Sequence, residues 1–180
     1  MNITRRGDRY AAIDMGSNAI RLWLGEHRPG RLKVERKVRC PLPLGGNVVA
    51  HGGFRPETVG ALETFFREAR AISDTFGAEQ RVAVATSASR DARNGQQVLD
   101  LIRARTGWDT QIITGCDEGR LIEVSVQDSL GAATAPRLIF DLGGGSLELV
   151  YVRPGVASRR VSLRLGVRRF PELVGAGPIG

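Results

Sequence analysis

Two stretches far apart in the chain repeat one pattern, and this repeat limits the folds open to it. "AAIDMGSNAIRLWL" (11–24) and "LIFDLGGGSLELVY" (138–151) each run as an apolar strand, an aspartate, a tight turn of small residues and a second strand. Asp14 falls on Asp141, and apolar residues on either side fall on apolar residues. A unit found twice indicates duplication, so we expect two similar lobes that each begin with this hairpin.

The two turns contain no large side chain. Their residues are Gly16, Ser17 and Asn18 in the first, and Gly143, Gly144, Gly145 and Ser146 in the second. Glycine weakens a strand, because it loses the most conformational entropy on folding and has no side chain to bury. One explanation is a turn that needs positive φ. The other is a backbone that comes close to a bound group.

Two matched turns, each led by an aspartate, favour the second explanation. Successive backbone N–H groups in such a turn form a concavity that binds anions. We therefore expect the turns to hold a phosphate from two sides, while the aspartates bind a metal ion or order a water. The pattern differs from a P-loop, which carries Lys-Ser, and from a dinucleotide fold, in which a helix follows the turn.

Hydrophobic periodicity predicts an α/β lobe over residues 1–130. We expect an antiparallel meander of strands over 10–14, 19–26 and 32–40, followed by a Pro- and Gly-rich loop over 41–54. We then expect a helix from Pro56 to about Thr75, a strand over 81–86, a helix near 96–105, a strand over 110–114 and a helix near 117–130. This order is typical of a ribonuclease-H-like α/β lobe with a mixed five-stranded sheet.

A second, shorter lobe is expected after a hinge of small residues at 131–136. Its strands are predicted over 137–141, 146–152 and 158–165, so that residues 137–180 form the truncated start of a duplicated lobe. So few residues bury little core by themselves. Exposed strand edges and apolar surface would then favour self-association, with a homodimer as the simplest product.

Composition narrows the classes of partner. The net charge of +7 suits nucleic acid, an anionic membrane surface or a polyanionic small molecule. The arginines are scattered apart from one cluster at 158–170, and no aromatic platform for stacking bases accompanies them. Cys40 and Cys116 lack metal-site spacing, and no apolar run approaches a membrane span. With no apolar leader at the N-terminus, we expect a cytoplasmic protein without a specific nucleic-acid or membrane partner.

In this order and spacing, the motifs resemble the exopolyphosphatase/guanosine pentaphosphate phosphatase (Ppx/GppA) family of the actin-like ATPase superfamily. The matching segments are "AIDMGSNAIRL" (12–22), "ATSASRDARNG" (85–95), "ITGCDEGRLI" (113–122), "IFDLGGGSLELV" (139–150) and, more weakly, "VSLRLGVRRF" (161–170). The resemblance implies Mg²⁺-dependent release of a terminal phosphate from inorganic polyphosphate or guanosine pentaphosphate.

The resemblance also implies roles for particular residues. Glu118 matches the catalytic glutamate that orients and deprotonates the attacking water, and Arg90 matches an arginine that faces the phosphate chain. Asp141 and Glu148 match acidic positions near the metal and water, and Asp14 is the first-lobe counterpart of Asp141. The phosphate-turn positions fall on Ser17, Asn18, Gly143, Gly144, Gly145 and Ser146.

Three functions remain open from the sequence. The first is an exopolyphosphatase-type hydrolase, and the second is a truncated, non-catalytic remnant that binds polyphosphate or guanosine phosphates, because family members continue well beyond this length. The third is an actin-like sugar or acetate kinase, although no segment resembles an adenosine site. Arg21 is equally consistent with a solvated strand face and with a phosphate ligand.

Overall fold

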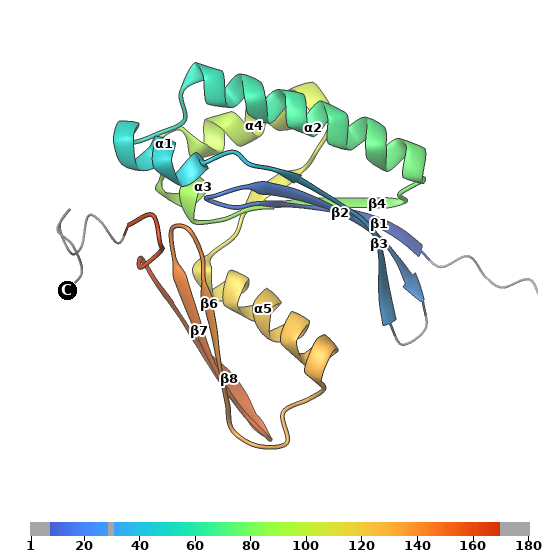
Figure 1. Ribbon diagram of the computed structural model, residues 1–180, viewed down its shortest axis with the longest axis vertical. Coiled ribbons are helices and arrows are strands. Elements are labelled where there is room, and N and C mark those ends of the chain that lie inside the picture. The colour runs from blue at the N-terminus through green and yellow to red at the C-terminus, as the bar shows by residue number, and fades with distance from the viewer. Residues whose placement is uncertain (1–7, 29–30, 170–180) are drawn as a thin grey trace, which may run out of the picture.

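The computed structural model describes residues 8–28 and 31–169 (Figure 1). The strands are β1 (Asp8–Met15), β2 (Ile20–Arg28), β3 (Arg31–Cys40), β4 (Gln80–Ala85), β5 (Thr110–Ile112), β6 (Arg137–Leu142), β7 (Leu147–Arg153) and β8 (Val156–Leu163). The helices are α1 (Leu44–His51), α2 (Pro56–Phe76), α3 (Ser87–Asp91), α4 (Gly95–Thr106) and α5 (Gly115–Leu130). No helix within these residues combines the length and the apolar character that crossing a membrane requires.

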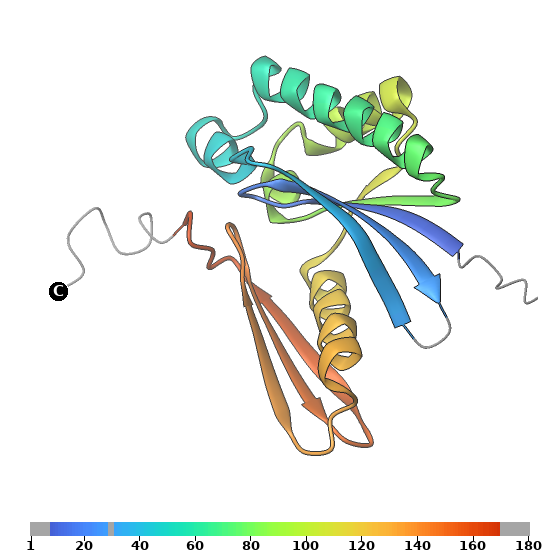
Figure 2. The same ribbon diagram turned by 45° about the vertical axis from the view of Figure 1, so that its right-hand side comes forward.

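The first sheet confirms the predicted mixed five-stranded sheet. Its strand order is β3-β2-β1-β4-β5, with β1 to β3 antiparallel and β4 and β5 parallel to β1. Helices α2 and α4 cover one face of this sheet (Figure 2). Pro56 begins α2, and Gly77 ends it in the left-handed conformation. Phe66 of α2 packs edge-on against Trp108, and both side chains are fully buried.

The prediction of a loop over 41–54 was wrong, because α1 lies inside this stretch. Leu44 and Val48 are one helical turn apart and both are buried in the core. The Gly45 N–H donates to the carbonyl of Ser17 over 2.8 Å, which anchors α1 to the first turn. Tertiary packing therefore overrides the low helix propensity of Gly45 and Gly46. The short helix α3 was not predicted either.

The second sheet is the predicted antiparallel meander β6-β7-β8. We placed α5 in the first lobe, but it packs against this second sheet, next to β7 and β8. Glu123 of α5 is buried and pairs with Arg160 of β8, and Ser158 donates to its carboxylate over 2.5 Å. Ile122 and Val126 of α5 pack against the apolar cluster of this sheet. The hinge at 131–136 stays a prediction.

The two hairpins share one register. Asp14 pairs across its hairpin with Arg21, and Asp141 pairs with Glu148 at the equivalent position. In both turns the first glycine N–H donates to the carbonyl three residues later, over 3.2 Å at Gly16 and 2.9 Å at Gly143. The sequence repeat is thus a repeat of local structure.

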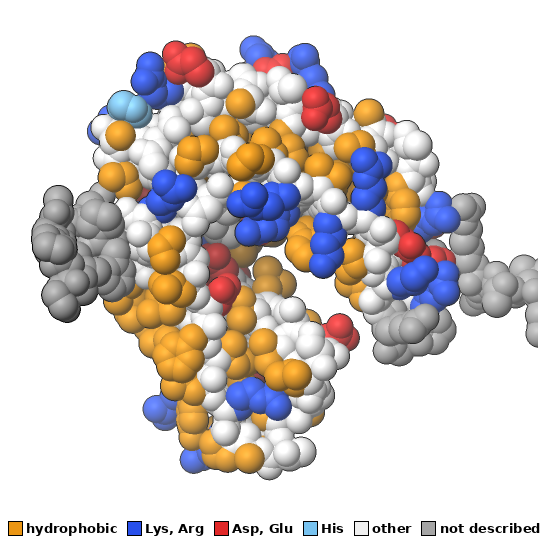
Figure 3. Space-filling model, viewed as in Figure 1, with side chains coloured by type: hydrophobic (Ala, Val, Ile, Leu, Met, Phe, Trp, Pro, Cys, Tyr) orange, Lys and Arg blue, Asp and Glu red, His pale blue; other side chains and the backbone are white. Residues whose placement is uncertain are grey.

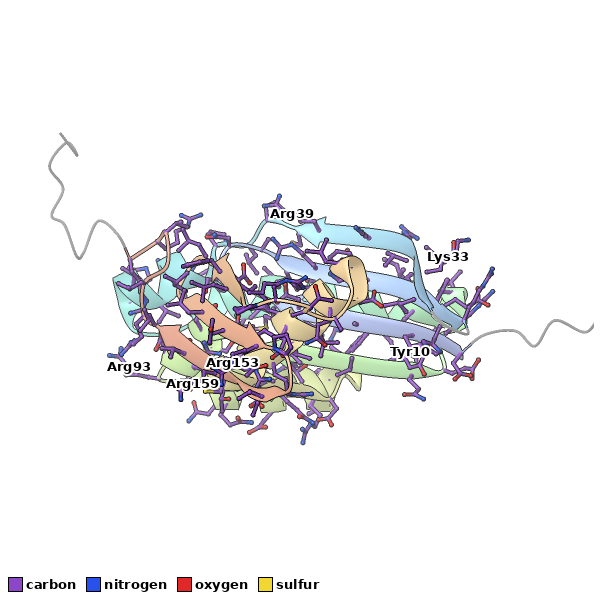
Figure 4. The ribbon with its side chains drawn as sticks, turned by 90° about the horizontal axis from the view of Figure 1, so that it is seen from below. Tyr10, Lys33, Arg39, Arg93, Arg153 and Arg159 are labelled. Carbon is purple, nitrogen blue, oxygen red and sulfur yellow. The ribbon has the colours of Figure 1, made fainter. Side chains whose placement is uncertain are left out.

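The repeated hairpins differ sharply in burial. Ile13 and Met15 are 1% and 0% exposed, whereas the matching residues Phe140 and Leu142 are 64% and 54% exposed. Among residues 8–28 and 31–169, helices cover this face of the hairpin in the first lobe and not in the second. Figure 4 views the second sheet from below, and Arg159, opposite Tyr151 in the β7–β8 register, belongs to the same uncovered face.

This contrast predicts different costs for matched truncations. Ile13→Ala should lower the free energy of unfolding by about 2–5 kcal/mol, because it leaves a cavity in a packed core. Phe140→Ala should cost about 0.5 kcal/mol or less, as surface substitutions do. Urea unfolding followed by circular dichroism measures both. A loss at Phe140 as large as that at Ile13 would contradict the exposed face.

Candidate active site

The two turns meet at a pocket of about 220 Å³ between the sheets. Its lining comprises Asp14, Gly16, Ser17, Asn18, Arg21, Thr86, Ser87, Glu118, Asp141, Leu142, Gly143, Gly144 and Ser146. Figure 3 shows the molecule hollowed between its upper and lower parts, with basic and acidic side chains on the walls. The pocket is strongly polar, which suits a charged ligand better than an apolar one.

Close approach of the backbone explains the glycines of the second turn. A Cβ atom on Gly144 would lie 2.8 Å from the Asn18 amide nitrogen, and one on Gly145 would lie 2.5 Å from the Ser87 hydroxyl. Neither glycine has positive φ, so that explanation fails for this turn. The first turn and the start of α3 occupy the space that side chains would need.

Glu118 lies in the first turn of α5, whose start is held by a capping box. Thr114 accepts a hydrogen bond from the Asp117 N–H over 3.1 Å, and the Asp117 carboxylate accepts from the Thr114 N–H over 3.4 Å. This cap fixes the helix start and therefore the direction of the Glu118 side chain. Arg90 donates to the Glu118 carboxylate over 3.0 Å and to the Ile113 carbonyl over 2.8 Å.

Burial raises the pKa of Glu118 from 4.5 to about 7. The negative charge of Glu148 adds to this rise, and the hydrogen bond and charge of Arg90 oppose it. A carboxylate with a pKa near neutrality is ionised in part and is a stronger base than an ordinary glutamate. This combination is typical of a general acid or base.

Of the three acidic site residues predicted in the hairpins, two line the pocket and the third is buried outside it. Asp14 and Asp141 both line the pocket. Burial raises the pKa of Asp14 although Arg21 lies 3.1 Å from its carboxylate, and the charge of Asp141 adds to the rise. Glu148 is 1% exposed, accepts a hydrogen bond from Ser162 over 2.8 Å and does not line the pocket.

The structure brings most of the predicted site residues together. Asp14, Ser17, Asn18, Glu118, Asp141, Gly143, Gly144 and Ser146 line the pocket, whereas Arg90, Gly145 and Glu148 lie beside it. Sequence reasoning missed Ser87, whose hydroxyl lies 2.8 Å from that of Ser17. Ser87 belongs to the matching segment "ATSASRDARNG" (85–95), in which a role is predicted only for Arg90.

Comparison with known proteins decides the family. The model of the Ppx/GppA phosphatase family matches residues 35–175. The chain belongs to the Ppx/GppA phosphatase family. Exopolyphosphatase 2 of Mycobacterium tuberculosis is 36% identical over 152 residues, which are 79% of this chain and 47% of that protein. Exopolyphosphatase 1 of Mycobacterium bovis is 33% identical over 90% of this chain and 47% of its own length.

Solved structures of the Ppx/GppA family share the fold. The Aquifex aeolicus family member superposes with a TM-score of 0.81 and 30% identity, over 92% of this chain and 54% of its own. An exopolyphosphatase from Cytophaga hutchinsonii gives a TM-score of 0.85 with 25% identity, over 93% of this chain and 54% of its own. The chain spans about half the length of the Ppx/GppA relatives it matches.

The raised pKa of Glu118 predicts a pH-dependent gain of stability in Glu118→Gln. Below pH 4.5 the carboxyl is neutral in the folded and unfolded states, so the variant should match the wild type. Between pH 4.5 and 7 the unfolded wild type ionises first, and its folded state loses stability relative to the variant. Above pH 7 the variant should be more stable by about 1–3 kcal/mol.

Thermal unfolding at pH 4.5 and pH 8 measures this difference. Glu68→Gln, on the exposed side of α2, removes a charge of the same sign and should change neither value. Equal stability of Glu118→Gln and wild type at pH 8 would contradict the raised pKa.

Proposed function

We propose that this site hydrolyses a terminal phosphoanhydride of inorganic polyphosphate or guanosine pentaphosphate, with Glu118 as the general base. The observation that carries the proposal is a carboxylate with a pKa of about 7 in the pocket between two glycine turns. The names of the mycobacterial exopolyphosphatases support the class of reaction. We also propose a cytoplasmic location and no specific nucleic-acid or membrane partner.

The turns would supply the phosphate contacts. Backbone N–H groups of both turns, with the Ser17 and Ser146 hydroxyls, would bind oxygens of the terminal phosphate. Arg21 lines the same pocket and would offset part of the substrate charge. Positioning and charge neutralisation dominate phosphoryl transfer, because little covalent work falls to the protein.

The proposed step is an in-line displacement by water. The water oxygen attacks phosphorus while Glu118 takes one of its protons. The bond to the bridging oxygen breaks, and that oxygen leaves with the electron pair. Arg90, which donates to the Glu118 carboxylate over 3.0 Å, orients the base in this scheme instead of binding the phosphate chain.

The acidic residues fit Mg²⁺. This ion keeps several waters and is usually held by one or two carboxylates together with substrate phosphates. Asp14 and Asp141 supply two such carboxylates, while among residues 8–28 and 31–169 no three His, Cys, Asp or Glu side chains form a metal cage. When bound, Mg²⁺ would neutralise charge on the phosphate oxygens. Glu148 would act on Glu118 through its charge, not as a direct ligand.

A second candidate function is binding without turnover. The chain covers 47% of the length of its mycobacterial relatives, so groups supplied by the rest of such a protein are outside it. The same pocket would then bind polyphosphate or guanosine phosphates as a regulatory remnant. Phosphate release by this chain, and by the chain joined to the unmatched part of Mycobacterium tuberculosis Exopolyphosphatase 2, separates the two functions.

Glu118→Gln should remove most turnover in the joined protein. Loss of a general base typically lowers the rate by ~10²–10⁴-fold. Tripolyphosphate affinity should change little, because the lost group acts on water. The wild-type kcat/KM should rise with pH up to about 7 and then level off, as Glu118 loses its proton. Wild-type turnover in Glu118→Gln, with Glu68→Gln as the matched control, would refute the mechanism.

Asp141→Asn should raise the Mg²⁺ concentration needed for half-maximal phosphate release. We expect a shift of roughly 10–100-fold, since even outer-shell changes reach this range at metal sites. Asp128→Asn removes an exposed carboxylate of α5 away from the pocket and should leave the requirement unchanged. An unchanged requirement in Asp141→Asn would show that Mg²⁺ binds elsewhere.

A further inference from the structure

The segment that follows β8 lies directly against the second glycine turn. The Val167 N–H donates to the Gly143 carbonyl over 3.1 Å, and the Arg168 N–H donates to the Gly144 carbonyl over 2.9 Å. A Cβ atom on Gly166 would lie 2.3 Å from the backbone of Gly144. Residues 166–168 are therefore bonded to the second turn and would move with it.

The same segment also reaches the first lobe. Arg168 donates to the side-chain oxygen of Asn18, in the first turn, over 2.7 Å. Arg169 forms an ion pair with Asp91, the last residue of α3, and Arg164 approaches the other oxygen of Asp91 to 2.9 Å. The side chains of Arg169 and Asp91 are 16% and 18% exposed, so water and salt screen this pair less than a surface pair.

Helix α3 connects this ion pair to the pocket. Its first residue, Ser87, contacts the Ser17 hydroxyl of the first turn, and Arg90, next to Asp91, holds Glu118. The ion pair thus joins a unit containing the first turn to a unit containing the second turn. Besides the ion pair, the hydrogen bond from Arg168 to Asn18 and the packing of Gly144 and Gly145 against small polar side chains also connect the two turns.

We propose that Asp91 and Arg169 are positioning residues that hold the two turns at the spacing at which both contact one phosphate group. We call the ion pair between Asp91 and Arg169 the clasp. This inference depends on the proposed function in one respect, namely that the turns bind phosphate. The effect of the clasp on the spacing of the lobes is independent of any catalysis. Loss of the clasp would let the second turn move away, so that fewer N–H groups reach the same anion.

The spacing is measurable in this chain without an activity assay. Spin labels are placed at Val82 of β4 and Val156 of β8, both exposed, in a background with Cys40 and Cys116 replaced by serine. Double electron–electron resonance should give a narrow distance distribution that broadens in Asp91→Asn and in Arg169→Gln. Arg169→Lys keeps the charge and should restore the narrow distribution in part.

A matched control is available in α2. Glu63 accepts ion pairs from Arg67 and Arg105, just as Asp91 does from Arg164 and Arg169, but it lies within the first lobe. Glu63→Gln should leave the interlobe distribution unchanged. Circular dichroism melting of each variant identifies any that fails to fold, and Arg169→Lys then carries the test.

Binding of sodium tripolyphosphate, measured by calorimetry, tests the consequence for the pocket. Asp91→Asn should weaken binding about tenfold, the change expected when a hydrogen bond to a charged group is lost. Glu63→Gln should not change it. An unbroadened distribution in Asp91→Asn would overturn the clasp whether or not the protein hydrolyses phosphate. A broadened distribution with unchanged tripolyphosphate binding would overturn the positioning role alone.

Discussion

The structure of the site depends on how closely two backbone turns approach each other. Gly144 and Gly145 lie so near Asn18, Ser17 and Ser87 that no Cβ atom fits between them. A side chain at either position would require the Asn18, Ser17 or Ser87 side chains to shift out of their present contacts. The glycines therefore matter because they have no side chain at the point where the two turns meet. In return for their cost in conformational entropy, the glycines allow residues of both turns to line one pocket.

The two hairpins share one pattern, but they differ in the charge of the residue that lies opposite the aspartate. Arg21 stands opposite Asp14 in the first hairpin, while Glu148 stands opposite Asp141 in the second. At this pair of positions the first hairpin carries opposite charges, whereas the second carries two acidic side chains. Burial and the charge of Glu148 raise the pKa of Glu118 against the pull of Arg90. The pKa of Glu118 is therefore raised mainly by burial, with Glu148 of the second hairpin adding to the rise and Arg90 of α3 opposing it.

Local patterns predicted the parts of the fold that local forces determine. The repeat, the two meanders and helix α2 follow from strand periodicity, from Pro56 and from Gly77, and most pocket residues follow from the repeat together with the family resemblance. Helix α1 could not be predicted, because its glycines are helical only through packing of Leu44 and Val48. The contact of Ser87 with Ser17 and the packing of the glycines against the first turn both join segments that are far apart in the sequence. No pattern within one segment reports such contacts.

The two turns of the site are supported by apolar cores of different size. The first turn is anchored in a large core, in which the hairpin residues Ile13 and Met15 are completely buried. The second turn belongs to a sheet whose buried apolar residues, within the described part of the chain, are Ile139, Val150 and Val152, packed under α5. The other face of that sheet, which carries Phe140 and Leu142, is exposed. With only this small apolar cluster behind it, the second turn also depends for its position on contacts with the first lobe. Preorganisation of the pocket is therefore a property of the junction between the lobes and not of either lobe alone.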